Sequence, residues 1–96
     1  MPLDPAFISR YADDIAFVAE EQPATNAEDF ISQLQHAGYV LDTYAGITGA
    51  EDLDTAATYL SDALDSTGDE HRLLVDRAAK YLAGASDMVE EYRLMV

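Results

Sequence analysis

Apolar residues recur at three- and four-residue steps along four stretches of the chain, and polar residues fill the positions between them. This spacing places the apolar side chains on one face of a helix, whereas a half-buried strand would show strict alternation. Each stretch is also bounded by residue types that begin or end helices. The pattern therefore predicts four helices, over residues 5–21, 26–45, 50–66 and 69–95.

The first predicted helix begins with Asp4 as its N-cap and Pro5 at its first position, where a missing N–H leaves no donor unpaired. It ends before Pro23, because a proline disfavours the helical conformation of the residue that precedes it. The apolar stripe expected to face the core consists of Phe7, Ile8, Tyr11, Ile15 and Val18.

The second predicted helix starts at a capping box, in which the side chains of Thr25 and Glu28 each bind a free backbone N–H of the first turn. An apolar seam at steps of four and three then predicts one helix through Gly38 to residue 45. An alternative is that the helix ends at Gly38 in a left-handed cap, with a separate turn or short strand over 39–44. The seam consists of Phe30, Leu34, Ala37, Leu41 and Tyr44.

Two further capping boxes, Thr48 with Glu51 and Thr67 with Glu70, predict the starts of the third and fourth helices. The third helix carries a narrow, alanine-rich stripe, which suits close packing between helices. The fourth helix carries the longest series of periodic apolar residues, with a second apolar row beside it. The alternative to one continuous helix is a break at 84–86, with Ser86 as the N-cap of a new helix. The third stripe is Leu53, Ala56, Ala57, Leu60, Ala63 and Leu64; the fourth is Leu74, Ala78, Tyr81, Ala85, Met88, Tyr92 and Met95, beside Val75, Leu82, Val89 and Val96.

Short breaks between helices of similar length favour antiparallel neighbours, so the expected fold is all-α, an antiparallel up-down-up-down four-helix bundle. A length of 96 residues predicts a single domain over 1–96. No stretch approaches the ~20 apolar residues of a membrane span, and the first residues lack the basic region of a secretory signal. A cytoplasmic protein is the resulting prediction.

The composition is strongly acidic, with 19 Asp and Glu against 5 Lys and Arg and a formal net charge of −14. Direct binding to nucleic acid or to an anionic membrane is electrostatically disfavoured, and a positively charged protein surface is the expected partner. Four of the five basic residues lie in the last predicted helix, so the first three helices carry most of the excess charge. A solvated acidic surface of the kind found in halophilic proteins is the alternative explanation.

Neither a cofactor, a metal site nor a catalytic residue is predicted. The absence of cysteine excludes disulfides, thiolate catalysis and cysteine-based zinc sites. Neither His36 nor His71 follows an acidic residue by three positions, as di-iron helical bundles require. Three acidic pairs resemble the Mg-binding spacing of all-α nucleotide pyrophosphohydrolases, but they project mainly away from the apolar stripes. A Mg-dependent nucleotide hydrolase is thus an alternative function, with the pairs Glu51 and Asp54, Asp62 and Asp65, and Asp87 and Glu90.

Large apolar side chains outside the stripes indicate where a partner would bind. Phe17 projects away from its stripe beside several acids, as an interface anchor with a charged rim would. Tyr39 and Tyr59 also lie off their stripes, and Leu94 lies opposite the long seam. The candidate partner-binding residues are Asp13, Phe17, Glu20, Glu21, Tyr39, Glu51, Asp54, Tyr59, Asp62 and Asp65.

These features predict a small non-enzymatic interaction domain whose acidic helical surface binds a basic partner. An inhibitor, an immunity or antitoxin-like factor, an assembly subunit, or a nucleic-acid mimic that occupies a nucleic-acid-binding protein would all fit this description. A structural subunit that self-associates through the wide apolar face of the last helix, as a homodimer for example, is a further alternative.

Overall fold

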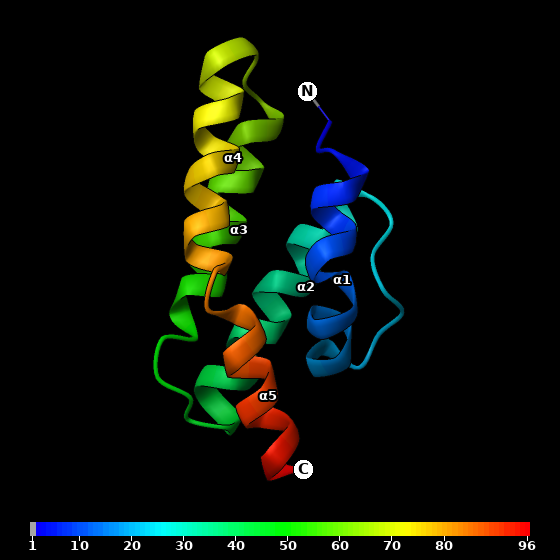
Figure 1. Cartoon of the computed structure of the whole chain (residues 1–96), viewed down its shortest axis with the longest axis vertical. Coiled ribbons are helices and arrows are strands. Elements are labelled where there is room, and N and C mark those ends of the chain that lie inside the picture. The colour runs from blue at the N-terminus through cyan, green and yellow to red at the C-terminus, as the bar shows by residue number, and fades with distance from the viewer. Residues whose placement is uncertain (1) are drawn as a thin grey trace.

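The computed structural model describes residues 2–96, and every regular element in that range is helical. The predicted all-α four-helix bundle is confirmed, with α4 and α5 together forming the fourth rod (Figure 1). The elements are α1 (Pro5–Ala19), α2 (Ala27–Tyr39), the π-helix η1 (Val40–Tyr44), α3 (Glu51–Leu64), α4 (Gly68–Leu82) and α5 (Ala85–Met95).

Helices α1 and α2 run in the same direction, because segment 20–26 travels back along α1 before α2 begins (Figure 1). Phe7, near the start of α1, contacts Phe30, near the start of α2, with ring centroids 6.4 Å apart. A seven-residue extended link spans roughly 23 Å, about the length of a 15-residue helix. This first pair therefore differs from the expected antiparallel hairpin, whereas α2 with α3 and α3 with α4 are antiparallel.

The predicted start of α1 is confirmed, since the Asp4 carboxylate accepts a hydrogen bond from the Ala6 backbone N–H at 2.9 Å. The helix ends at Ala19, two residues before the predicted end, because Glu20 adopts a left-handed conformation with φ 57°. A left-handed residue stops the helical ladder and lets the chain turn back toward α2.

The start of α2 lies one residue later than the predicted capping box. Asn26, rather than Thr25, accepts from the Asp29 backbone N–H at 2.9 Å, and its amide donates to the Asp29 carboxylate at 3.1 Å. Asparagine caps a helix as well as threonine does, so the same chemistry operates one position along the chain. The predicted capping boxes of α3 and α4 are wrong: α3 begins after Ala50 in a turn, and Thr67 holds the N-cap position without a side-chain hydrogen bond.

Helix α2 continues through Gly38, as predicted, and the alternative left-handed cap at this glycine is wrong. Gly38 is buried where α3 crosses α2: a Cβ here would lie 3.4 Å from both the Ala50 carbonyl oxygen and the Leu53 Cβ. Beyond Tyr39 the helix continues as the π-helix η1. Its wider turns change the direction in which the following residues of the apolar seam point. Leu41 stays buried, but Tyr44, predicted in the core, is 74% exposed.

The fourth predicted helix is broken, so a single helix over 69–95 is wrong and the alternative break is confirmed. Helix α4 ends at Leu82 and α5 begins at Ala85, with Gly84 rather than Ser86 at the N-cap position. Helix α4 packs on α3, whereas α5 turns to pack on α1. The expected continuous apolar face is consequently divided between two neighbours, and Tyr81 and Met95, predicted on its seam, are exposed.

The core is formed where α1, α2 and α3 meet, with contributions from both halves of the last rod. The alanine-rich stripe of α3 is fully buried from Leu53 to Ala63, as predicted, whereas Leu64 at its end is half-buried. The small side chains of this stripe permit close packing of the neighbouring helices. The largest fully buried side chains are Phe30, Ile15, Leu34, Leu41, Leu53, Leu60, Leu82, Val18 and Val89.

Replacing Asp4 with alanine should lower the free energy of unfolding by about 1 kcal/mol, because the first turn of α1 loses its side-chain acceptor. Urea denaturation followed by circular dichroism measures the change. Asp13→Ala is the matched control: this exposed carboxylate lies inside α1, and its loss should change stability by less than about 0.5 kcal/mol. Equal losses in the two variants would contradict the capping role.

Candidate interaction surfaces

One side of α3 presents a row of carboxylates to solvent, as the sequence predicted. Glu51, Asp54, Asp62 and Asp65 are all exposed. Within residues 2–96, the ion pairs involve Asp14, Asp69 and Glu90 as the acids and none of the carboxylates of α3. The negative charge of this face is therefore neutralised by no neighbouring side chain of the described chain.

Three of the predicted residues lie together at the lower end of α2, where α3 begins. Tyr39, Glu51 and Asp54 line a hollow of about 370 Å³, and Asp42 of η1 joins them. Sequence reasoning missed Asp42, although its position three residues after Tyr39 on a continuous helix would have placed both on one face. The result is a hollow with three carboxylates and a tyrosine at its edge.

Two tyrosines beside this hollow form an exposed aromatic pair. The rings of Tyr39 and Tyr44 meet edge to face, with centroids 5.6 Å apart. Hydrogen bonding to Tyr44, together with the charge that Tyr44 acquires when ionised, raises the pKa of the Tyr39 hydroxyl. This aromatic pair borders the carboxylates of the hollow.

A second group of predicted residues lies at the end of α1. Phe17, Glu20 and Glu21 line a hollow of about 500 Å³, and α5 contributes Tyr92 to its wall. Phe17 is 39% exposed, but much of its ring is already covered. The Arg93 guanidinium carbon lies 4.0 Å from the ring centroid, and the Tyr92 ring meets it edge-on at 6.0 Å. Phe17 thus helps to hold α5 on α1 and offers a partner only part of its surface.

The remaining predicted residues join neither hollow. Asp62 and Asp65 extend the acidic face along α3, while Asp13 is exposed on α1. Tyr59 lies on the α4 side of α3, stacked on Tyr81 with ring centroids 5.7 Å apart. The structure therefore places six of the ten candidates at two separate hollows, three at each, and leaves the other four outside both.

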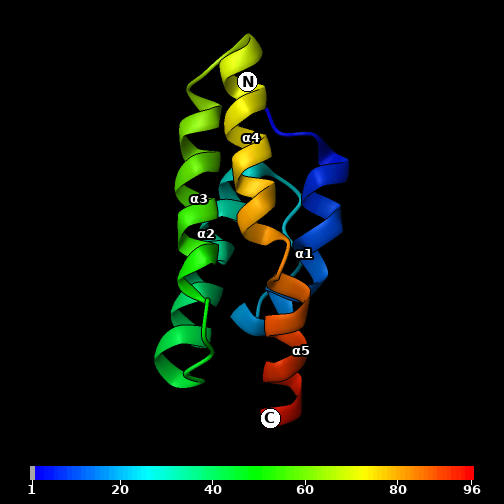
Figure 2. The same ribbon diagram turned by 60° about the vertical axis from the view of Figure 1, so that its left-hand side comes forward.

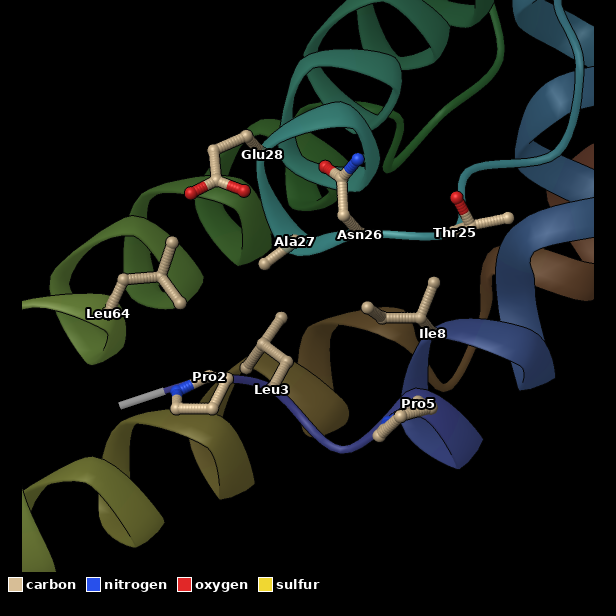
Figure 3. A pocket seen from close by; sticks show the side chains of 9 residues that line it. All are labelled: Pro2, Leu3, Pro5, Ile8, Thr25, Asn26, Ala27, Glu28 and Leu64. Carbon is tan, nitrogen blue, oxygen red and sulfur yellow. The ribbon is translucent and has the colours of Figure 1, made fainter.

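An apolar hollow of about 450 Å³ lies at the opposite end of the bundle, between the N-terminal segment, the start of α2 and the end of α3. Figure 3 shows Leu3, Ile8 and Leu64 entering it from different elements, with Glu28 at the rim. Among residues 2–96, Glu28 is the one ionisable side chain in the lining. This hollow offers space for an apolar group, and the described residues of its lining supply no second ionisable side chain for acid–base chemistry.

Within residues 2–96, His, Asp and Glu side chains form no group of three or more that could hold a metal ion. No helix in this range is both long and apolar enough to cross a membrane. No family model, curated protein or solved structure matches the chain. Function is accordingly inferred from the geometry and charge of these surfaces.

Proposed function

We propose that the protein is a small interaction domain that binds a basic protein surface through its acidic tyrosine face. We give this name to Glu51, Asp54 and Asp62 of α3 and Asp65 at its C-cap, together with the adjoining Tyr39, Asp42 and Tyr44. The unpaired carboxylates of α3 are the observation that carries the proposal. Clustered charges of one sign raise the energy of the folded chain, and a basic partner would relieve that repulsion.

The two parts of the acidic tyrosine face would contribute differently to binding. Carboxylates exposed along a helix mainly accelerate encounter and exclude acidic partners. The exposed rings of Tyr39 and Tyr44 supply contact area at low entropic cost and can accept arginine or lysine side chains on their faces. A nucleic-acid-binding protein is one partner of the right charge, and nucleic acid would then compete for it.

Neutralising the carboxylates of α3 should weaken binding to a fluorescent lysine- and arginine-rich peptide at least tenfold in 50 mM NaCl, because each lost carboxylate removes a favourable interaction with the cationic probe. Fluorescence anisotropy gives the affinity. In 300 mM NaCl the unaltered chain should also bind more weakly, since exposed charges are screened. The variant carries Glu51→Gln, Asp54→Asn, Asp62→Asn and Asp65→Asn.

A control variant removes four negative charges from α4 and α5 instead of from α3. It tests whether binding depends on the acidic tyrosine face or only on the net charge of the chain. It should bind within about threefold of the unaltered chain, because these acids lie outside the proposed face. Equal weakening in both variants, or binding indifferent to salt, would contradict the proposal. Sedimentation at the same concentrations shows whether the chain self-associates instead. The control carries Glu70→Gln, Asp76→Asn, Asp87→Asn and Glu91→Gln, four exposed positions.

A further inference from the structure

A groove of about 380 Å³ lies between the first turns of α1 and α4, two helices whose main packing partners are other helices. Figure 2 shows the upper part of α4 beside the start of α1. The side chains of Ala6, Phe7 and Val75 give the groove an apolar lining. A hollow of this size with apolar walls and a few polar groups is typical of small-molecule sites.

The polar groups of the groove are mostly basic, which is exceptional in this chain. Arg10 and Arg72 both line it, two of only five Lys and Arg residues. Arg10 forms no ion pair in the described part of the chain, and Arg72 forms one, at 3.7 Å, with the exposed Asp69. Exposed ion pairs contribute little stability, so both guanidinium groups are available to a ligand.

A histidine forms part of the wall of the groove, and two helices begin beside it. The Nδ1 of His71 donates to the Ala63 carbonyl oxygen at 2.7 Å, which fixes the ring in the wall. The first turns of α1 and α4 also bring their positive helix ends to this place. Asp4 is the opposing charge in the lining, and its carboxylate is already bound to the first turn of α1.

We propose that this groove binds a small apolar carboxylate, a short alkyl or aryl acid, independently of the acidic tyrosine face. The carboxylate lies between Arg10 and Arg72, and the hydrocarbon body covers Phe7 and Val75. An apolar lining selects against a bare inorganic anion, and the cationic rim selects against a neutral molecule of the same shape.

Titration of the full chain with 4-phenylbutyrate, followed by amide NMR shifts, tests the proposal. A ligand of this size in an open groove should bind with a Kd on the order of 1 mM. Saturable shifts are expected at Phe7, Arg10, His71 and Val75. The neutral amide of the same acid should bind about tenfold more weakly, because it lacks the charge-assisted hydrogen bonds. Acetate, which has the charge without the apolar body, should cause no saturable shift in the same range.

Arg10→Gln with Arg72→Gln should weaken 4-phenylbutyrate binding at least tenfold while leaving the circular dichroism spectrum unchanged. Arg77→Gln is the control for the loss of an arginine from α4; Arg77 lies beside Tyr59 and does not line the groove. It should bind as the unaltered chain does. The proposal is overturned if 4-phenylbutyrate shows no saturable shift up to about 10 mM, if its neutral amide or acetate binds equally well, or if the double variant binds normally.

Discussion

Replacing Phe30 with alanine is expected to lower the free energy of unfolding by about 3–5 kcal/mol. The ring is fully buried and contacts Phe7 and Tyr11 of α1 at centroid distances of 6.4 and 6.5 Å. It therefore fills the space where the parallel helices α1 and α2 meet, and its removal leaves a cavity that a rigid helix pair cannot close. The free energy of unfolding of a typical domain is about 5–15 kcal/mol, so this substitution should remove a large part of the stability of the protein.

Urea denaturation followed by circular dichroism measures this loss, with two variants as controls. Phe30→Leu keeps most of the apolar volume and should cost less than half as much as the alanine variant. Leu94→Ala should change stability by less than about 0.5 kcal/mol, since Leu94 is 81% exposed. A loss below about 1.5 kcal/mol for Phe30→Ala would show that α1 and α2 are held together elsewhere.

The buried positions could be predicted because burial follows the helical period. Ile15, Leu34 and Leu60 each occupy a predicted stripe, and each is fully buried. The same reasoning placed the carboxylates of α3 on its outer face, where they are exposed. These outcomes depend only on which way a side chain points from a helix, which the local spacing determines.

The behaviour of the two glycines inside predicted helices could not be settled in the same way. Both Gly38 and Gly84 cost about 1 kcal/mol relative to alanine in a helix interior. At Gly38 the absence of a side chain lets α3 pack closely on α2, and the helix continues. Next to Gly84 the helix breaks, and α5 packs on α1. Packing between distant segments therefore decides between two sequences of similar local propensity.

Surfaces formed by distant segments were also beyond the local pattern. The hollow beside Tyr39 needs the end of α2 to meet the start of α3, and the widening at η1 adds the exposed Tyr44. The groove between α1 and α4 brings together Arg10 and Arg72, which lie far apart in the sequence, and this requires α1 and α4 to begin at the same end of the bundle. The link between α1 and α2 is long enough to return along α1, which permits the two helices to run in the same direction. A link of this length also permits an antiparallel pair, so the sequence pattern could not distinguish the two arrangements.

Replacing Val89 with aspartate is expected to detach α5 while the rest of the bundle stays folded. Val89 is 1% exposed, so a carboxylate at this position would be buried without a partner. Helix α5 has 11 residues and packs mainly on α1, and an isolated helix of that length is marginally stable in water. Undocking returns the new charge to water, which limits the loss of stability to the free energy of docking α5, roughly 2–4 kcal/mol.

Amide hydrogen exchange separates this local opening from global unfolding. Protection in α5 should fall at least 100-fold, whereas protection in α2 and α3 should fall much less, because α5 contributes three residues, Ala85, Met88 and Val89, to a core otherwise formed by the rest of the chain. Leu94→Asp places the same charge on an exposed position of the same helix and should leave the exchange pattern unchanged. Simultaneous loss of protection in all helices would show that α5 is an inseparable part of the core. Retained protection in α5 would instead mean that Arg93, through Phe17 and the 3.5 Å ion pair with Asp14, holds the helix without Val89.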